Sequence, residues 1–309
     1  MLNEKIALVT GAHGTIGRYV ALTLAAHNWN VVGLGHGEWS SQDQSRWGLS
    51  SWHEGDVSLD SLRALKLQPA LIVHCAGSGD VGASITAPYV DFQRTVSTTS
   101  SVLEFLRVDC PKSSLVYPSS AAVYGVADRF PLDEASPLHP TSPYGVHKRI
   151  AEELLVEHAR IFGLKAAVVR LFSIYGEEFR KQLLWDACQR ISVNESVFFG
   201  TGDETRDWLH VSDAAELLVE AANHASFLCP IVNGGYGRSV SVRDVLSKLF
   251  QLMGRHDQPE FCGTQRPGDP NHYHADMRQA LTWGWQPEIA WEDGLARYVS
   301  WFKQEQGLK

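Results

Sequence analysis

Short apolar runs alternate with longer amphipathic segments through the first half of the chain. Apolar runs bounded by glycine or polar residues indicate buried parallel strands, and the longer segments between them repeat their apolar positions at helical spacing. Strands are expected at residues 5–10, 30–34, 71–74, 114–117 and 166–171, with helices after residue 17, over 88–107 and from Ser142 onward. This alternation predicts an α/β fold built on a doubly wound parallel sheet of the Rossmann type.

The pattern changes after Phe172, where segments become shorter and richer in Gly, Pro and Trp. Further helices are expected near residues 181–190, 213–222, 242–253 and 292–301, and a Gly- and Ser-rich loop from Gly35 to about Ser51. We therefore expect a first, Rossmann-type domain over residues 1–172 and a smaller, mixed α/β lobe over 173–309. Segments near 197–225 are candidates to rejoin the first domain.

Composition, charge and cysteine spacing exclude several classes of protein. The 309 residues are 44% hydrophobic and 20% charged, with a net charge of −8, so no basic surface points to nucleic acid or to an anionic membrane. No apolar run reaches membrane-spanning length, and the first strand follows Met1 so closely that no signal peptide is expected. The five cysteines are odd in number, scattered and without a CxxC pair, which argues against a disulfide framework or a metal site and favours the cytoplasm.

Tyr144 and Lys148 stand four residues apart where a helix is expected to begin. Ser142 suits the N-cap and Pro143 the first turn, and residues 150–155 continue the helical pattern. The two side chains should therefore share one helical face. A tyrosine with its usual pKa of ~10 is a poor acid or base at neutral pH, and a neighbouring ammonium lowers that pKa by favouring the phenolate.

A glycine cluster lies between the first strand and the first helix. Gly11, Gly14 and Gly17 occupy the position of a dinucleotide-binding turn, in which glycines let a diphosphate approach the amides at a helix N-terminus. A Gly-x-x-Gly-x-x-Gly pattern alone is weak, and its context between a strand and a helix is what favours a bound dinucleotide.

With Ser120 added to the glycine turn and the Tyr144/Lys148 pair, the chain resembles the extended short-chain dehydrogenase/reductase family. More narrowly, it resembles the nucleotide-sugar epimerase/dehydratase branch, typified by UDP-glucose 4-epimerases. The resemblance covers nearly the whole chain and rests on seven motifs in order. They are residues 10–17, Asp56-Val57, residues 74–77, residues 118–125, residues 142–145 with Lys148, residues 206–211 and residues 266–269.

The resemblance assigns roles to individual residues. Tyr144 would be the catalytic acid/base, Lys148 would bind the nicotinamide ribose and lower the tyrosine pKa, and Ser120 would hydrogen-bond the reacting sugar oxygen. Ser119, next to it, is expected to be a packed or backbone-bonded hydroxyl. Besides Tyr144 and Lys148, the cofactor-binding residues would be Gly11, Gly14, Thr15, Ile16, Gly17, His36, Asp56, Val57, Cys75, Ala76, Gly77 and Thr95. Besides Ser120, the substrate-binding residues would be Ser173, Gln182, Phe199, Arg206, Arg266, Asp269 and Tyr273.

Two positions discriminate between the chemistries of the branch. Sugar 4,6-dehydratases carry an Asp-Glu pair where this chain has Ala121-Ala122, so dehydration is not expected. NAD-specific members carry an acid at the end of the second strand, where this chain has Gly35. Its absence, with His36, Ser40, Ser41 and Arg46 nearby as donors, favours NADP over NAD.

The leading expectation is therefore a reductase that delivers hydride from NADPH to C4 of a 4-keto sugar nucleotide. The alternative is a nucleoside-diphosphate-hexose 4-epimerase that retains NAD, and a minor one is a non-catalytic NADP-sensing protein. The resemblance also implies a homodimer and a role in carbohydrate metabolism, such as polysaccharide biosynthesis.

Overall fold

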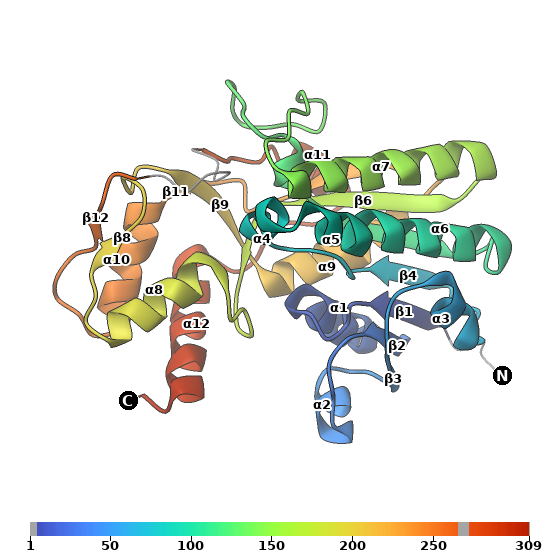
Figure 1. Ribbon diagram of the computed structural model, residues 1–309, viewed down its shortest axis with the longest axis horizontal. Helices are drawn as coiled ribbons and strands as arrows, with labels where there is room; N and C mark the ends of the chain where they lie inside the picture. Colours follow the sequence, from blue (N-terminus) through green and yellow to red (C-terminus); the bar gives the residue numbers. More distant parts are fainter. Residues whose placement is uncertain (1–4, 265–271, 309) are drawn as a thin grey trace.

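The main sheet of the computed structural model, which describes residues 5–264 and 272–308, has seven parallel strands in the order β10-β6-β5-β4-β1-β2-β3 (Figure 1). The strand order reverses direction between β1 and β4, so the carboxyl ends of these two strands flank the crevice where such sheets bind ligands. The expected Rossmann sheet is confirmed. The strands are β1 (Ile6–Thr10), β2 (Asn30–Gly35), β3 (Ser51–Glu54), β4 (Leu71–His74), β5 (Ser114–Ser120), β6 (Lys165–Leu171) and β10 (Ile231–Gly234).

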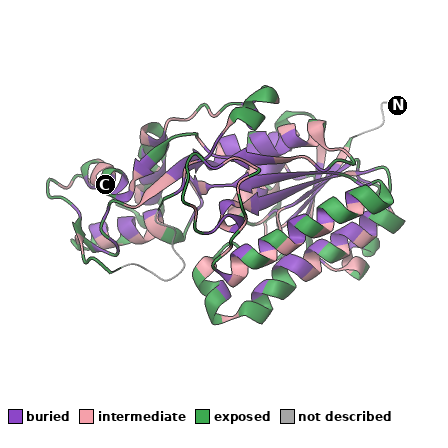
Figure 2. Cartoon of the chain, turned by 90° about the horizontal axis from the view of Figure 1, so that it is seen from above, coloured by how far each residue is buried: buried purple, intermediate pink, exposed green. Residues whose placement is uncertain are grey.

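Helices cover both faces of the sheet because its strands are apolar on both sides. On β1, Ala7 and Val9 belong to the hydrophobic cluster that includes α1 (Thr15–Ala26) and α9 (Val211–His224). Leu8 between them points into the opposite cluster, which includes residues of three helices. These are α3 (Leu59–Ala64), α6 (Thr98–Val108) and α7 (Pro143–Phe162). Figure 2 shows the strands as buried and the outer faces of the helices as exposed.

The second lobe contains two small sheets and several helices. One sheet has the order β11-β9-β7 and the other pairs β12 with β8. The strands are β7 (Ser173–Tyr175), β8 (Val197–Phe198), β9 (Thr205–His210), β11 (Ser239–Ser241) and β12 (Glu260–Phe261). Its helices are α8 (Gln182–Ser192), α10 (Val242–Leu252) and α12 (Trp291–Gln306), whereas α11 (Arg278–Thr282) packs against β10 of the main sheet. The chain returns to the first domain in between, since α9 packs against α1 and β10 pairs with β6.

Some elements differ from the sequence expectation. The segment expected as a loop from Gly35 to Ser51 contains α2 (Ser41–Arg46), because the Ser40 side chain caps it by accepting from the Asp43 amide. The helix expected over 88–107 is divided into α5 (Pro88–Phe92), a π-helical turn at Gln93–Ser97, and α6. A further short helix, α4 (Val81–Thr86), is capped by Asp80.

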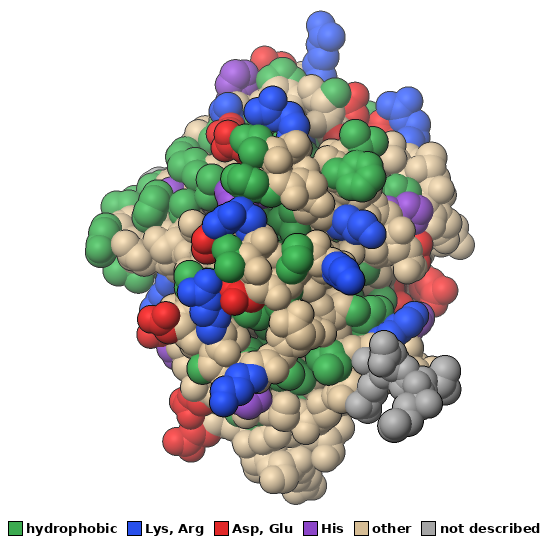
Figure 3. All heavy atoms as spheres, turned by 90° about the vertical axis from the view of Figure 1, so that its right-hand side faces the viewer, with side chains coloured by type: hydrophobic (Ala, Val, Ile, Leu, Met, Phe, Trp, Pro, Cys, Tyr) green, Lys and Arg blue, Asp and Glu red, His purple; other side chains and the backbone are tan. Residues whose placement is uncertain are grey.

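On the surface seen in Figure 3, acidic and basic side chains are interspersed among apolar and uncharged ones. Within residues 5–264 and 272–308, no helix is both long and apolar enough to cross a membrane.

Candidate active site

The glycine turn lies at the carboxyl end of β1 and opens α1. Gly11 has φ +69°, and a Cβ there would lie 2.6 Å from the Ala76 amide nitrogen, so only glycine fits the turn against the strand beside it. Helix α1 begins after Gly14 with no side-chain cap and no acid in its first turn. Free amide donors at an uncapped helix start suit an anion, so these residues fit the diphosphate of a dinucleotide.

The carboxyl end of β4 forms the other wall of the crevice. The Thr95 hydroxyl, on the π-helical turn, accepts the Ser78 amide at 3.4 Å and is buried. A Cβ on Gly77 would lie 3.9 Å from that hydroxyl and 4.0 Å from Lys148 Nζ. The residues after β4 therefore lie against both Thr95 and Lys148, two residues that the resemblance assigns to the nicotinamide end.

The start of α7 brings the three expected catalytic residues together. Ser142 caps the helix through the Gly145 amide, and a Cβ on Gly145 would lie 2.5 Å from the Ala122 carbonyl oxygen, so the helix packs directly on the turn after β5. Ser120 ends β5 at that turn, where its hydroxyl accepts the Ala122 amide at 3.2 Å. Lys148 Nζ donates to the Pro118 carbonyl at 2.9 Å. It lies 6.0 Å from the centre of the Tyr144 ring and 4.6 Å from that of Tyr117.

Burial dominates the protonation behaviour of this group. Burial raises the pKa of Tyr144, and the hydrogen bond from Ser120 opposes the rise. This differs from the expectation that Lys148 would lower the tyrosine pKa, because the sequence argument weighed the neighbouring charge without the loss of solvent. Burial also lowers the pKa of Lys148 to about 8.

A cavity of about 880 Å³ joins the glycine turn to the three expected catalytic residues. Its size and its mixture of apolar walls with a few polar groups are typical of ligand sites. The expected residues that line it are Gly11, Gly14, Thr15, Ile16, Gly17, Cys75, Gly77, Ser120, Tyr144, Lys148, Ser173, Gln182, Phe199, Arg206 and Tyr273. His36, Asp56, Val57, Ala76 and Thr95 are not part of this lining.

The expected adenosine end lies at the edge of the sheet. His36 Nε2 and Asp56 Oδ1 are 2.8 Å apart, and both side chains are exposed. At Gly35, a Cβ would lie 3.3 Å from the Trp52 ring, so an indole occupies the space beside the position where the family carries its acid. Arg46 does not stand free for a second phosphate, because it pairs with Glu178 at 3.4 Å.

Among the described residues, the expected substrate residues beyond Ser120 come from five separate segments: Ser173 on β7, Gln182, Phe199, Arg206 and Tyr273. Arg206 lies on β9 with its guanidinium donating to the Thr205 carbonyl at 3.0 Å, and Gln182 begins α8. Phe199 is half exposed, whereas Tyr273 is buried with its ring centre 5.9 Å from that of Phe172. Arg266 and Asp269 lie outside the residues that the structure describes.

Several cavity residues were missed by the sequence argument. Residues 78–82, with Ile85 of α4, line the cavity next to Lys181, whose Nζ lies 3.4 Å from the Gly79 carbonyl. Ser84 Oγ accepts the Tyr144 amide at 3.1 Å and so fixes the start of α7. The run of glycine and serine directly after a buried strand was an available signal for these residues.

Comparison with known proteins matches this geometry to a family. The sequence model described as the NAD dependent epimerase/dehydratase family matches residues 7–233. A putative UDP-glucose 4-epimerase of Methanocaldococcus jannaschii is 30% identical over 96% of this chain and 98% of its own. The UDP-glucose 4-epimerase of Mycolicibacterium smegmatis is 28% identical over 96% and 98%.

Solved structures share the fold over nearly the whole chain. MoeE5, in a complex with UDP-glucuronic acid and NAD, superposes with a TM-score of 0.86 at 27% identity. The match covers 97% of this chain and 99% of MoeE5.

Proposed function

The chain belongs to the NAD-dependent epimerase/dehydratase family, and from that premise we propose that it is a UDP-hexose 4-epimerase that retains NAD. One observation carries the proposal: Ser120, Tyr144 and Lys148 line the same cavity as the glycine turn. This arrangement supports Tyr144 as the group that exchanges a proton with the sugar beside a bound nicotinamide. The names of the two relatives support the epimerase alternative over the reductase that the sequence favoured, and NAD in the MoeE5 complex supports NAD over NADP.

The side chains suggest how the proton would move. A bound nicotinamide supplies the hydride chemistry at C4. Tyr144, as phenolate, removes the proton from the C4 hydroxyl and later returns it, so the reaction needs no net proton from solvent. Ser120 holds the same oxygen, and its hydroxyl opposes the rise in the Tyr144 pKa that burial causes. Lys148, whose Nζ lies 6.0 Å from the centre of the Tyr144 ring, is proposed to bind the nicotinamide ribose.

Dehydration is not proposed for this site. Ala121 and Ala122 follow Ser120 in the cavity lining, and neither can protonate a leaving hydroxyl. The remaining chemistry of the family, proton and hydride transfer at one carbinol carbon, needs only the three catalytic residues and the dinucleotide.

The second lobe would hold the nucleotide part of the substrate. Arg206 and Gln182 are proposed to bind the diphosphate, because a guanidinium fork and an amide donate well to phosphate oxygens. Phe199 is proposed to pack on the base, and the bulk of Tyr273 to favour a hexose without an N-acetyl group. Arg266 and Asp269 are proposed for the diphosphate and the nucleoside ribose from the sequence alone. A cytoplasmic homodimer that serves carbohydrate metabolism completes the proposal.

The experiment is to denature the purified protein and identify the released dinucleotide, and in parallel to incubate the native protein with UDP-glucose or UDP-galactose. We expect about one NAD per chain and interconversion of the two sugars without added cofactor. An empty site that binds and oxidises NADPH in the presence of a 4-keto sugar nucleotide would replace the epimerase with the reductase.

Tyr144→Phe provides the site test. Its turnover should fall by about 10²–10⁴-fold, the usual contribution of a general acid/base, with the bound NAD unchanged. Tyr117→Phe is the matched control, because Tyr117 also lies beside Lys148 but does not line the cavity. Full activity in the Tyr144 variant would remove the mechanism.

A further inference from the structure

Residues 176–182, called the strap here, run from the end of β7 to the first residue of α8 and cross the cofactor crevice. On one rim, Thr15 Oγ1 of the glycine turn donates to the Glu178 carbonyl at 3.2 Å. On the other rim, Lys181 Nζ and Gln182 Nε2 each lie 3.4 Å from the Gly79 carbonyl, which both can donate to. Phe179, Lys181 and Gln182 line the cavity beneath. The strap therefore touches both walls of the crevice that the glycine turn and the end of β4 form.

Glu178 fixes the middle of the strap. Its carboxylate is buried and pairs with three guanidinium groups: Arg18 of α1 at 3.0 Å, Arg46 of α2 at 3.4 Å and Arg180 of the strap at 2.9 Å. Its backbone is in the left-handed region at φ +70°, which a residue with a side chain adopts only when its surroundings hold it there. A buried carboxylate that loses its charged partners strongly destabilises the folded protein. These pairs therefore resist opening of the strap.

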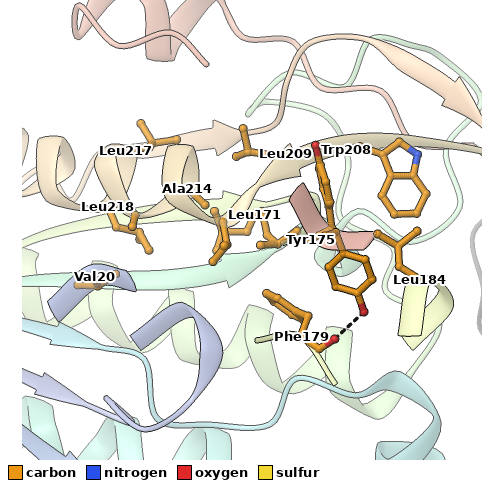
Figure 4. Close-up of a cluster of buried hydrophobic side chains, with 14 of the residues drawn as sticks. Val20, Leu171, Tyr175, Phe179, Leu184, Trp208, Leu209, Ala214, Leu217 and Leu218 are labelled. Atoms are coloured by element: carbon orange, nitrogen blue, oxygen red, sulfur yellow. Dashed lines mark hydrogen bonds between the residues drawn. The ribbon is translucent and has the colours of Figure 1, made fainter. Parts of the chain in front are cut away.

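The neighbours of Glu178 are anchored to other elements. Phe179 is buried in the large hydrophobic cluster with Leu184 and Tyr175 (Figure 4), and its carbonyl accepts the Tyr298 hydroxyl of α12 at 2.8 Å. Glu177 Oε2 lies 3.0 Å from Nε2 of His210 at the end of β9. Arg180 donates to Glu305 at 2.6 Å. Displacing the strap therefore requires breaking contacts with both domains at once.

We propose that Glu178, through Arg18, Arg46 and Arg180, locks the strap over the bound dinucleotide and so keeps it in place from one turnover to the next. The inference deepens the proposed function and rests on it, because an epimerase uses a cofactor that is reoxidised in place, whereas a reductase needs one that exchanges. Glu178 is a positioning residue: it contacts the arginines and, through its carbonyl, the glycine turn, and does not take part in the chemistry.

The test measures dinucleotide release directly. Glu178→Gln keeps the shape of the side chain and removes its charge. The purified variant and wild type, both loaded with radiolabelled NAD, are diluted into excess unlabelled NAD, and the retained label is followed with time. We expect release from Glu178→Gln to be at least about tenfold faster, since contacts that hold a ligand act mainly on its dissociation rate. Asp257→Asn, which breaks a distant carboxylate–guanidinium pair with Arg255, should release NAD as the wild type does.

If Glu178→Gln does not fold, two further variants test the same ion pairs. Arg46→Gln and Arg180→Gln remove partly exposed partners, and each should speed release by a smaller factor. Wild-type release rates in the folded variants would overturn the role of Glu178 while leaving the epimerase proposal intact. A wild-type protein that carries no dinucleotide and exchanges it freely would overturn both.

Discussion

The Ser119 hydroxyl donates a hydrogen bond of 2.5 Å to Glu152 Oε1 and so joins strand β5 to helix α7 in the interior. Glu152 also receives the Arg170 guanidinium, whose Nη2 lies 2.8 Å from Oε2. Each partner is adjacent to a proposed catalytic residue, because Ser119 precedes Ser120 and Glu152 lies one turn beyond Lys148. The buried link therefore fixes the position of Ser120 relative to Tyr144 and Lys148.

Ser119→Ala should lower both stability and turnover. The variant loses a hydrogen bond to a buried carboxylate, worth about 1.5–3 kcal/mol of unfolding free energy. Turnover should fall on the order of tenfold, because small displacements of reacting groups slow the chemical step. Ser113→Ala is the control: Ser113 is also buried and donates to the Pro69 carbonyl, but it precedes the opposite end of β5. Equal turnover of the two variants would show that the link is structural only.

The buried ammonium of Lys148 should lower the free energy of unfolding. Burial lowers its pKa to about 8 from a usual value near 10.5, so the folded state binds its proton less tightly than the unfolded state does. Lys148→Met should therefore raise the unfolding free energy at pH 7 by about 2 kcal/mol, after allowing for the unpaired Pro118 carbonyl. The gain should be constant below pH 8 and shrink between pH 8 and 10.5, where only the unfolded state still holds the proton. Urea denaturation across this pH range measures it, and a gain that grows above pH 8 would contradict the argument.

The sequence could predict those site residues whose position follows from a motif in their own stretch of chain. Gly11, Tyr144 and Lys148 were predicted from strand, turn and helix signals within a few residues, and Ser120 from the family resemblance; all four line the same cavity. The sheet followed for the same reason, from apolar runs bounded by glycine. Glu178 could not be found this way, because its three arginine partners come from α1, α2 and its own strap, which only the folded chain brings together.

The direction of the Tyr144 pKa shift could not be predicted from the sequence. Spacing placed Lys148 beside Tyr144, but the degree of burial of each depends on Tyr117, Cys75 and the packing of α7 on β5. Burial then reverses the expected direction of the Tyr144 pKa. The short helices α2 and α4 were missed because their serine, glycine and aspartate residues also suit loops, and only the capping contacts of Ser40 and Asp80 distinguish the two.

Gly35 should decide how well the protein tells NAD from NADP. Its backbone is outside the left-handed region, so Gly35→Asp is conformationally allowed, although its Cβ would lie 3.3 Å from the Trp52 ring. The new carboxylate should repel a 2′-phosphate and raise the ratio of the NADP to the NAD dissociation constant by at least about tenfold. Calorimetric titration of protein stripped of dinucleotide measures both constants. Gly35→Asn, with the same shape and no charge, is the control, and an equal ratio in both variants would assign the effect to shape.

The charge of Asp91, on α5, should set the pH range over which the protein is active. Its carboxylate is buried on α5, with Oδ2 at 2.5 Å from His147 Nδ1, and among the described residues Oδ1 has no hydrogen-bond partner. Besides His147, the charge acts on Tyr144 and Lys148 of α7 and on Tyr117 of β5, and it raises the pKa of each of these three groups.

Asp91→Asn removes that charge and keeps an acceptor for His147. The pKa values of Tyr144 and Lys148 should then both fall, the first because the phenolate is less repelled and the second because the ammonium is less favoured. Both limbs of the bell-shaped profile of kcat against pH should move to lower pH. Glu153→Gln is the control, since Glu153 lies on the exposed face of α7 and solvent screens its charge. An unmoved profile in Asp91→Asn, or an equal movement in both variants, would exclude a specific role for the Asp91 charge.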